Sequence, residues 1–121
     1  MEDYRELKVW QQAMDLAVAC YEMTKPFPRE ELFGMTSQIR RCATSIPANI
    51  AEGWGRQSTG DYIRFLRIAQ GSLKELETHL LLCNRVGLVS SDQLKTHETQ
   101  TTSIGKMLAA LIRSLSRGNS Q

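Results

Sequence analysis

Apolar side chains recur along most of the chain at alternating steps of three and four residues, the spacing of one face of an α-helix. The clearest runs, at 32–50, 62–83 and 94–115, keep this spacing for five or more steps. Alternating segments rich in Val, Ile and Tyr, which are typical of strands, are absent from the sequence. The pattern therefore predicts an all-α fold.

Turn and capping residues divide the pattern into four helices, expected at about 6–25, 30–53, 59–86 and 91–117. Their connections are short, and four helices joined in this way pack as an antiparallel up-and-down bundle. We expect residues 1–121 to form one such domain.

The first expected helix carries two apolar stripes. One contains Leu7, Trp10, Met14, Ala17 and Tyr21, and a neighbouring one contains Val9, Leu16, Cys20 and Met23. A helix that is apolar over two stripes usually packs on two sides. Together with Phe65 and Leu82, which lie off the main seam of the third helix, this surplus predicts helix-mediated self-assembly.

Pro47 lies inside the second expected helix, where it removes one backbone hydrogen bond. The segment is either one kinked helix or two helices broken at 45–47. We favour the kinked helix, because the apolar seam keeps its phase through the proline. Gly53 and Gly55 then predict the C-terminal end of this helix. In the third helix, Gly71 has no side chain and would allow another helix to approach closely.

Composition limits the class of protein. The chain has 121 residues, of which 41% are hydrophobic and 23% charged, as in soluble globular domains. It has no apolar run of the ~20 residues that span a membrane, and its charged N-terminus is unlike a signal peptide. Three cysteines without close spacing favour a reducing cytoplasm.

The net charge of +2 is unevenly distributed. Residues 38–74 carry +4 and residues 100–121 carry +3, whereas residues 1–37 carry −3 and 75–99 carry −2. The basic middle segment would suit an anionic partner. Alternatively, its arginines simply solvate the outer faces of helices.

Motifs for catalysis are not found, so we expect no enzyme, cofactor or metal. The alternative is a small metal-binding or catalytic bundle that uses Glu75, His79 and Cys83, which follow one another at i, i+4 and i+8 on the third helix. These three residues would need a further ligand from another segment.

The densest group of polar side chains lies at 37–56. On a helix, five of them share a face away from the apolar seam: Gln38, Arg41, Ser45, Asn49 and Glu52. This face is either solvated or buried against a neighbouring subunit, where Arg41 and Glu52 would form charge-assisted bonds.

At these residues the sequence resembles the four-helix bundle family encoded in the intervening sequences of bacterial 23S rRNA. The similarity covers about residues 6–90. It rests on 9–11, 27–28 with Glu31, 33–41, 45–53, Arg56, 65–66, Ala69, 71–73 and 75–78. The motif residues that we consider for a subunit interface are Gln38, Arg40, Arg41, Ser45, Pro47, Asn49, Glu52 and Gly53.

The resemblance implies a homopentameric ring without catalytic residues. It also implies kinship with the accessory proteins of diversity-generating retroelements, which bind nucleic acid and the reverse transcriptase. We therefore expect this protein to bind itself, and RNA or DNA together with a reverse transcriptase, but no membrane. The candidate nucleic-acid contacts are Arg56, Arg64 and Arg67.

Overall fold

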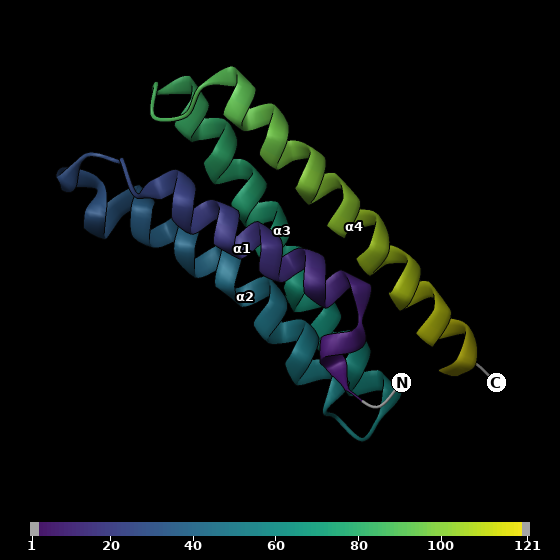
Figure 1. Cartoon of the computed structure of the whole chain (residues 1–121). Coiled ribbons are helices and arrows are strands. Elements are labelled where there is room, and N and C mark those ends of the chain that lie inside the picture. The colour runs from purple at the N-terminus through teal and green to yellow at the C-terminus, as the bar shows by residue number, and fades with distance from the viewer. Residues whose placement is uncertain (1–2, 120–121) are drawn as a thin grey trace.

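The chain forms four α-helices in the computed structural model, which describes residues 3–119 (Figure 1). They are α1 (Lys8–Thr24), α2 (Ser37–Trp54), α3 (Thr59–Arg85) and α4 (Ser91–Asn119), and a short 3-10 helix, η1 (Tyr4–Glu6), precedes α1. Residues 3–119 contain no strand, which confirms the prediction of an all-α fold.

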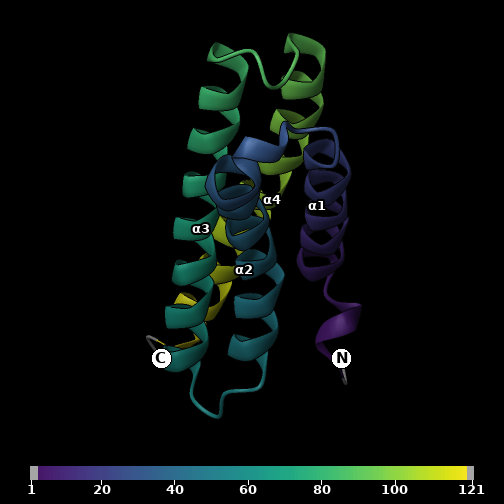
Figure 2. The same cartoon turned by 90° about the vertical axis from the view of Figure 1, so that its left-hand side faces the viewer.

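Each helix runs opposite to the one before it and packs against two neighbours (Figures 1 and 2). Helix α2 lies between α1 and α3, and α4 packs against α3 and α1. Apolar side chains from all four helices meet in one core. The largest fully buried members are Leu16, Ile39, Ile46, Ile50, Leu66, Leu73, Leu76, Leu80, Ile104 and Leu108.

Side-chain caps begin α3 and α4 where the sequence predicts them. The Ser58 hydroxyl accepts a hydrogen bond from the Asp61 amide at 3.1 Å. Ser90 and Gln93 form a reciprocal capping box, with each side chain accepting a hydrogen bond from the other residue's backbone amide, at 3.1 and 2.9 Å.

The segment before α2 is not the regular helix that the sequence pattern predicts from residue 30. A 3-10 turn, η2 (Arg29–Glu31), and a π-helical turn, η3 (Leu32–Thr36), replace its first turns. Gly34 takes a non-helical conformation with φ −109° and ψ −113°, which breaks the helical phase. The prediction that Leu32 lies on the buried seam is therefore wrong: Leu32 is exposed, and so is Phe33, with 93% of its surface accessible.

Helix α2 continues through Pro47 without a break, so the segment is one helix and not two, and Pro47 is buried. The helix ends at Trp54, and Gly55 is its C-terminal cap. Gly53 lies inside the helix and has a packing role, because a Cβ atom there would lie 2.9 Å from Tyr62 Cδ1 and 3.0 Å from Phe65 Cβ. The interface between α2 and α3 is thus too close for any larger side chain at this position.

The two apolar stripes of α1 face different environments. The core takes the stripe that contains Val9, Leu16, Cys20 and Met23, all of which are buried. In the other stripe, Leu7, Trp10 and Ala17 are partly buried against the core, whereas Met14 and Tyr21 are exposed together with Val18. Helix α1 therefore leaves three apolar side chains exposed on one side of the helix.

Candidate functional site

The polar residues of α2 divide between the interior of the chain and solvent. Ser45 and Ser72 share a hydrogen bond of 2.8 Å between their hydroxyl oxygens, which joins α2 to α3. The Asn49 amide donates to the carbonyl and hydroxyl oxygens of Ser45, at 2.8 and 3.0 Å. Gln38, Arg41 and Glu52, in contrast, are exposed.

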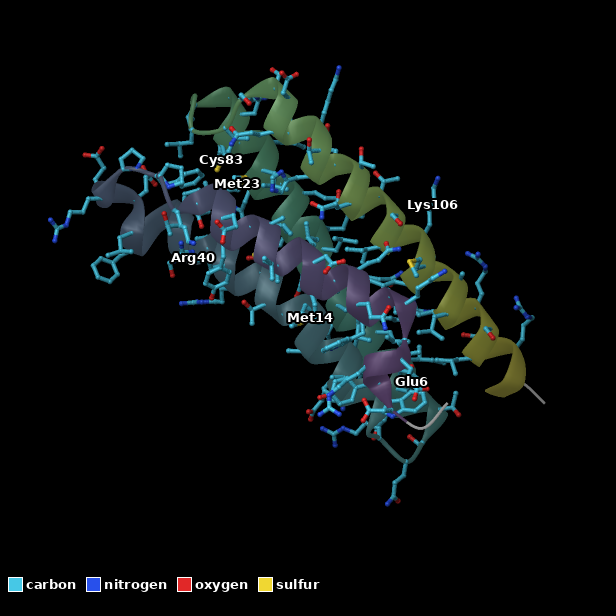
Figure 3. The ribbon with its side chains drawn as sticks, viewed as in Figure 1. Glu6, Met14, Met23, Arg40, Cys83 and Lys106 are labelled. Carbon is cyan, nitrogen blue, oxygen red and sulfur yellow. The ribbon has the colours of Figure 1, made fainter. Side chains whose placement is uncertain are left out.

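Arg40 connects α2 to the end of α1. Its Nε atom donates a hydrogen bond of 2.9 Å to the hydroxyl oxygen of buried Thr24, and its guanidinium lies 4.6 Å from the centre of the Tyr21 ring. Figure 3 places Arg40 at the end of the bundle where Met23 also lies. Arg40 therefore makes contacts that hold the protomer together.

Glu52 forms its ion pair within α2 and the turn that follows. Its carboxylate lies 2.7 Å from the Arg56 guanidinium, one helical turn further on. Arg41 is three turns away from Glu52 on the same helix and forms no ion pair within residues 3–119. The expected bond between Arg41 and Glu52 therefore remains a prediction about two different subunits.

The three candidate nucleic-acid contacts are not equivalent. Arg56 and Arg64 both place their guanidinium groups over the Phe65 ring, at 4.6 and 4.5 Å from its centre. Arg64 also lies 3.6 Å from the Asp61 carboxylate. Arg67 is exposed and has no ion pair within the described chain, so its charge is the most available of the three.

Arg67 lies at a groove of about 680 Å³ between α3 and α4. Gly71 and Gly105 line it, and its charged lining residues are the cations Arg67, Lys74 and Lys106 and the acid Glu77. Lys74 pairs with Glu77 on its own helix at 3.0 Å, whereas Lys106 forms no ion pair among residues 3–119. Figure 3 shows Lys106 extending from α4 away from the bundle.

Sequence reasoning did not identify the two lysines of this groove. Arg67, Gly71 and Lys74 follow one another at i, i+4 and i+7, so one face of α3 carries all three. That spacing could have predicted that Lys74 lies on the same face of α3 as Arg67. The sequence could not predict that Lys106 lies near them, because its position depends on how α4 packs against α3.

Helix α1 exposes three large apolar side chains on one face. Met14, Val18 and Tyr21 follow one another at i, i+4 and i+7, and Val18 is 59% exposed. Leu82 and Val86 on α3 are also exposed. The three α1 side chains are the candidates for an apolar contact with another subunit.

The possible metal ligands do not assemble as the sequence suggested. Glu75 and His79 do lie together, with 3.6 Å between a carboxylate oxygen and Nε2. The cysteine beside them is Cys42 from α2, not Cys83. Sequence reasoning missed Cys42, because its place beside α3 depends on the rotation of one helix against the other.

All three thiols are free and buried. Burial raises the pKa of Cys20 to about 12 and that of Cys83 to about 11. Burial, together with the neighbouring Glu75 carboxylate, raises the pKa of Cys42 to about 12. Each thiol is therefore protonated at neutral pH, the form in which a cysteine is a poor nucleophile.

Known proteins similar to this chain share its fold. The family model described as 23S rRNA-intervening sequence protein matches residues 5–110. A crystal structure from Bacteroides thetaiotaomicron, a protein of unknown function from the S23 ribosomal protein family, is 32% identical, with a TM-score of 0.78. The alignment covers 86% of this chain and 97% of that one.

Among curated proteins, no match is found. In the part of the chain that the structure describes, none of the helices is long and apolar enough to cross a membrane.

Proposed function

This chain belongs to the family of 23S rRNA-intervening sequence proteins, and on that premise we propose that it is a non-enzymatic, homo-oligomeric protein that binds nucleic acid. The observation that carries the proposal is the groove between α3 and α4, which is lined by three cations, two glycines and a single acid, Glu77. The same family membership carries the expectation of five subunits.

The groove has the chemistry of a phosphate-binding surface. Arg67 and Lys106 come from facing helices, and neither has an acidic partner within residues 3–119. Gly71 and Gly105 lack side chains, so a sugar-phosphate backbone would approach the helices closely between the two cations. Such contacts recognise phosphates rather than bases, and binding should therefore depend weakly on sequence.

Assembly would strengthen this weak site. The exposed stripe of Met14, Val18 and Tyr21 on α1 supplies apolar surface for a contact between subunits. Five copies would raise the net charge from +2 to about +10 and repeat the groove around the ring. A nucleic acid that spans several grooves would bind more tightly than one groove allows.

The partners we propose are RNA or DNA and, by kinship with retroelement accessory proteins, a reverse transcriptase in the cytoplasm. A gene for a reverse transcriptase beside the gene for this protein would support the second partner.

The test is a series of binding measurements with labelled single-stranded RNA and DNA at increasing NaCl concentration. Wild-type protein should bind at low salt and lose affinity steeply as salt releases condensed counterions. The double variant Arg67→Glu, Lys106→Glu should lose binding and keep the molar mass of the wild type. The double variant Arg29→Glu, Arg85→Glu changes two exposed arginines outside the groove; it is the charge-matched control and should keep most of the affinity. Absence of binding at low salt would refute the proposal.

A further inference from the structure

Three side chains with metal-binding atoms meet between α2 and α3. The Cys42 sulfur, a Glu75 carboxylate oxygen and a His79 ring nitrogen all lie within 4.8 Å of one another. Glu75 and His79 are one turn apart on α3, and Cys42 reaches them from α2. The three donors thus come from two helices that pack closely in the core of the bundle.

His79 lacks a hydrogen-bond partner in this cluster. Its Nε2 atom is buried and has no hydrogen-bond partner. The nearest Glu75 oxygen, at 3.6 Å, is beyond hydrogen-bond distance. A buried polar atom without a partner is costly, and a cation held between this nitrogen, the carboxylate and the sulfur would satisfy it.

The donor set selects a class of ion. Thiolate, imidazole and carboxylate are the three ligand types of protein zinc sites, whereas Mg²⁺ and Ca²⁺ prefer oxygen ligands alone. Tetrahedral Zn²⁺ needs donor atoms about 3.3–3.7 Å apart, given bond lengths of about 2.0–2.3 Å. Small rotations of the Glu75 and His79 side chains, both of which reach solvent, would close the present spacing.

We propose that Cys42, Glu75 and His79 form a Zn²⁺ site that links α2 to α3. As Zn²⁺ binds, the Cys42 thiol releases its proton to solvent and the sulfur coordinates the ion as a thiolate. His79 coordinates through Nε2 and Glu75 through one carboxylate oxygen. Glu75 is partly exposed, so the fourth position faces solvent and takes a water molecule.

The fold does not depend on this ion, because nineteen buried apolar side chains besides Cys42 already form the core within residues 3–119. Zn²⁺ would therefore stabilise a chain that folds without it, and stabilisation would grow with the free ion concentration. This expectation separates the site from the obligatory zinc sites of small domains, which unfold when the metal is removed.

The experiment is a titration of the reduced, metal-free protein with Co²⁺, which replaces Zn²⁺ and is visible by its absorption. Wild type should bind one ion per chain, with thiolate-to-cobalt absorption in the near ultraviolet and the intense visible bands of tetrahedral cobalt. Zn²⁺ should then displace Co²⁺ and raise the melting temperature.

Three variants and two controls identify the ligands. Cys42→Ser should abolish the thiolate band, and His79→Gln and Glu75→Gln should each weaken binding by at least about tenfold. Cys83→Ala and His97→Gln remove a cysteine and a histidine outside the cluster, and both should titrate like wild type.

Two results would overturn the proposal: no thiolate band in wild type at millimolar Co²⁺, or the same band in folded Cys42→Ser. If Cys42→Ser does not fold, the test of the site depends on His79→Gln. This variant should fold, because His79 is partly exposed and lies outside the apolar core. Unchanged Co²⁺ affinity in folded His79→Gln would also refute the site.

Discussion

Arg40 and Thr24 form a hydrogen bond of 2.9 Å that joins α2 to the C-terminal end of α1. The Thr24 hydroxyl is buried and donates its own hydrogen to the Cys20 carbonyl at 2.8 Å. Arg40 therefore supplies the hydrogen bond that this oxygen accepts, and its guanidinium also covers the Tyr21 ring.

Arg40→Ala should lower the free energy of unfolding by about 2 kcal/mol, because it removes a charged donor and a cation–π contact together. Arg85→Ala, an exposed arginine of α3, is the control and should change it by less than about 0.5 kcal/mol. Urea denaturation at one fixed protein concentration measures both. Equal effects would show that the Arg40 contacts contribute no stability.

Gly53 and Gly71 should respond in opposite ways to alanine. A Cβ atom on Gly53 would lie 2.9 Å from the Tyr62 ring, so Gly53→Ala should destabilise the protein by about 1–3 kcal/mol. No heavy atom lies within 4 Å of the same position on Gly71. Gly71→Ala should therefore stabilise α3 by up to about 1 kcal/mol, the usual gain in helix propensity. Thermal denaturation of the two variants checks the contrast, and destabilisation by Gly71→Ala would contradict it.

Substitution of a buried and of an exposed aliphatic residue by Asp should separate effects on folding from effects on assembly. Ile46 is fully buried, so Ile46→Asp should place an unpaired carboxylate in the core and prevent folding, at a cost of several kcal/mol. Val18 is 59% exposed on α1, so Val18→Asp should keep the helical circular dichroism signal and lower the molar mass to that of a monomer. A folded Ile46→Asp with wild-type stability would contradict the core assignment. A Val18→Asp variant with unchanged mass would remove this stripe from the interface.

The buried thiols predict a loss of stability at alkaline pH. In the unfolded chain Cys20 releases its proton near pH 9, whereas burial in the folded chain raises its pKa to about 12. The protonated thiol contributes its full stabilisation of the folded state below pH 9. Above pH 9 this contribution decreases, because the thiol of the unfolded chain ionises while that of the folded chain stays protonated. Each such thiol contributes about 1.4 kcal/mol per pH unit in this window. Urea denaturation between pH 8 and 10.5 should show that the free energy of unfolding decreases less steeply with pH for Cys20→Ala than for wild type. Equal slopes would contradict the raised pKa of Cys20.

The sequence was sufficient to place most of the buried seam. The spacing from Thr36 to Ile50 and from Leu66 to Cys83 identified residues that are all buried, since one helical period sets which side chains share a face. It could not decide which stripe of α1 is fully buried in the core. Both stripes have the helical period, and the stripe of Val9 and Leu16 is buried because of how α1 packs against α2 and α4.

Two other features depend on tertiary packing in the same way. The conformation at Gly34 ends the helical phase that the apolar spacing continues to Leu32, and glycine permits such a break without requiring it. Cys42 meets Glu75 and His79 because α2 and α3 pack with one particular rotation. The apolar seams of the two helices show which faces meet, but they do not show which residues at the edge of each seam come into contact.

The most direct test of the proposed function is sedimentation velocity with a labelled single-stranded RNA, recorded separately for protein and RNA. At low salt, the protein should sediment as five times 13.7 kDa, or about 68 kDa, with the RNA moving at the same boundary. Raising the NaCl concentration should release the RNA and leave the protein boundary in place. A 13.7 kDa species with RNA sedimenting at its free rate would contradict both the assembly and the binding that we propose.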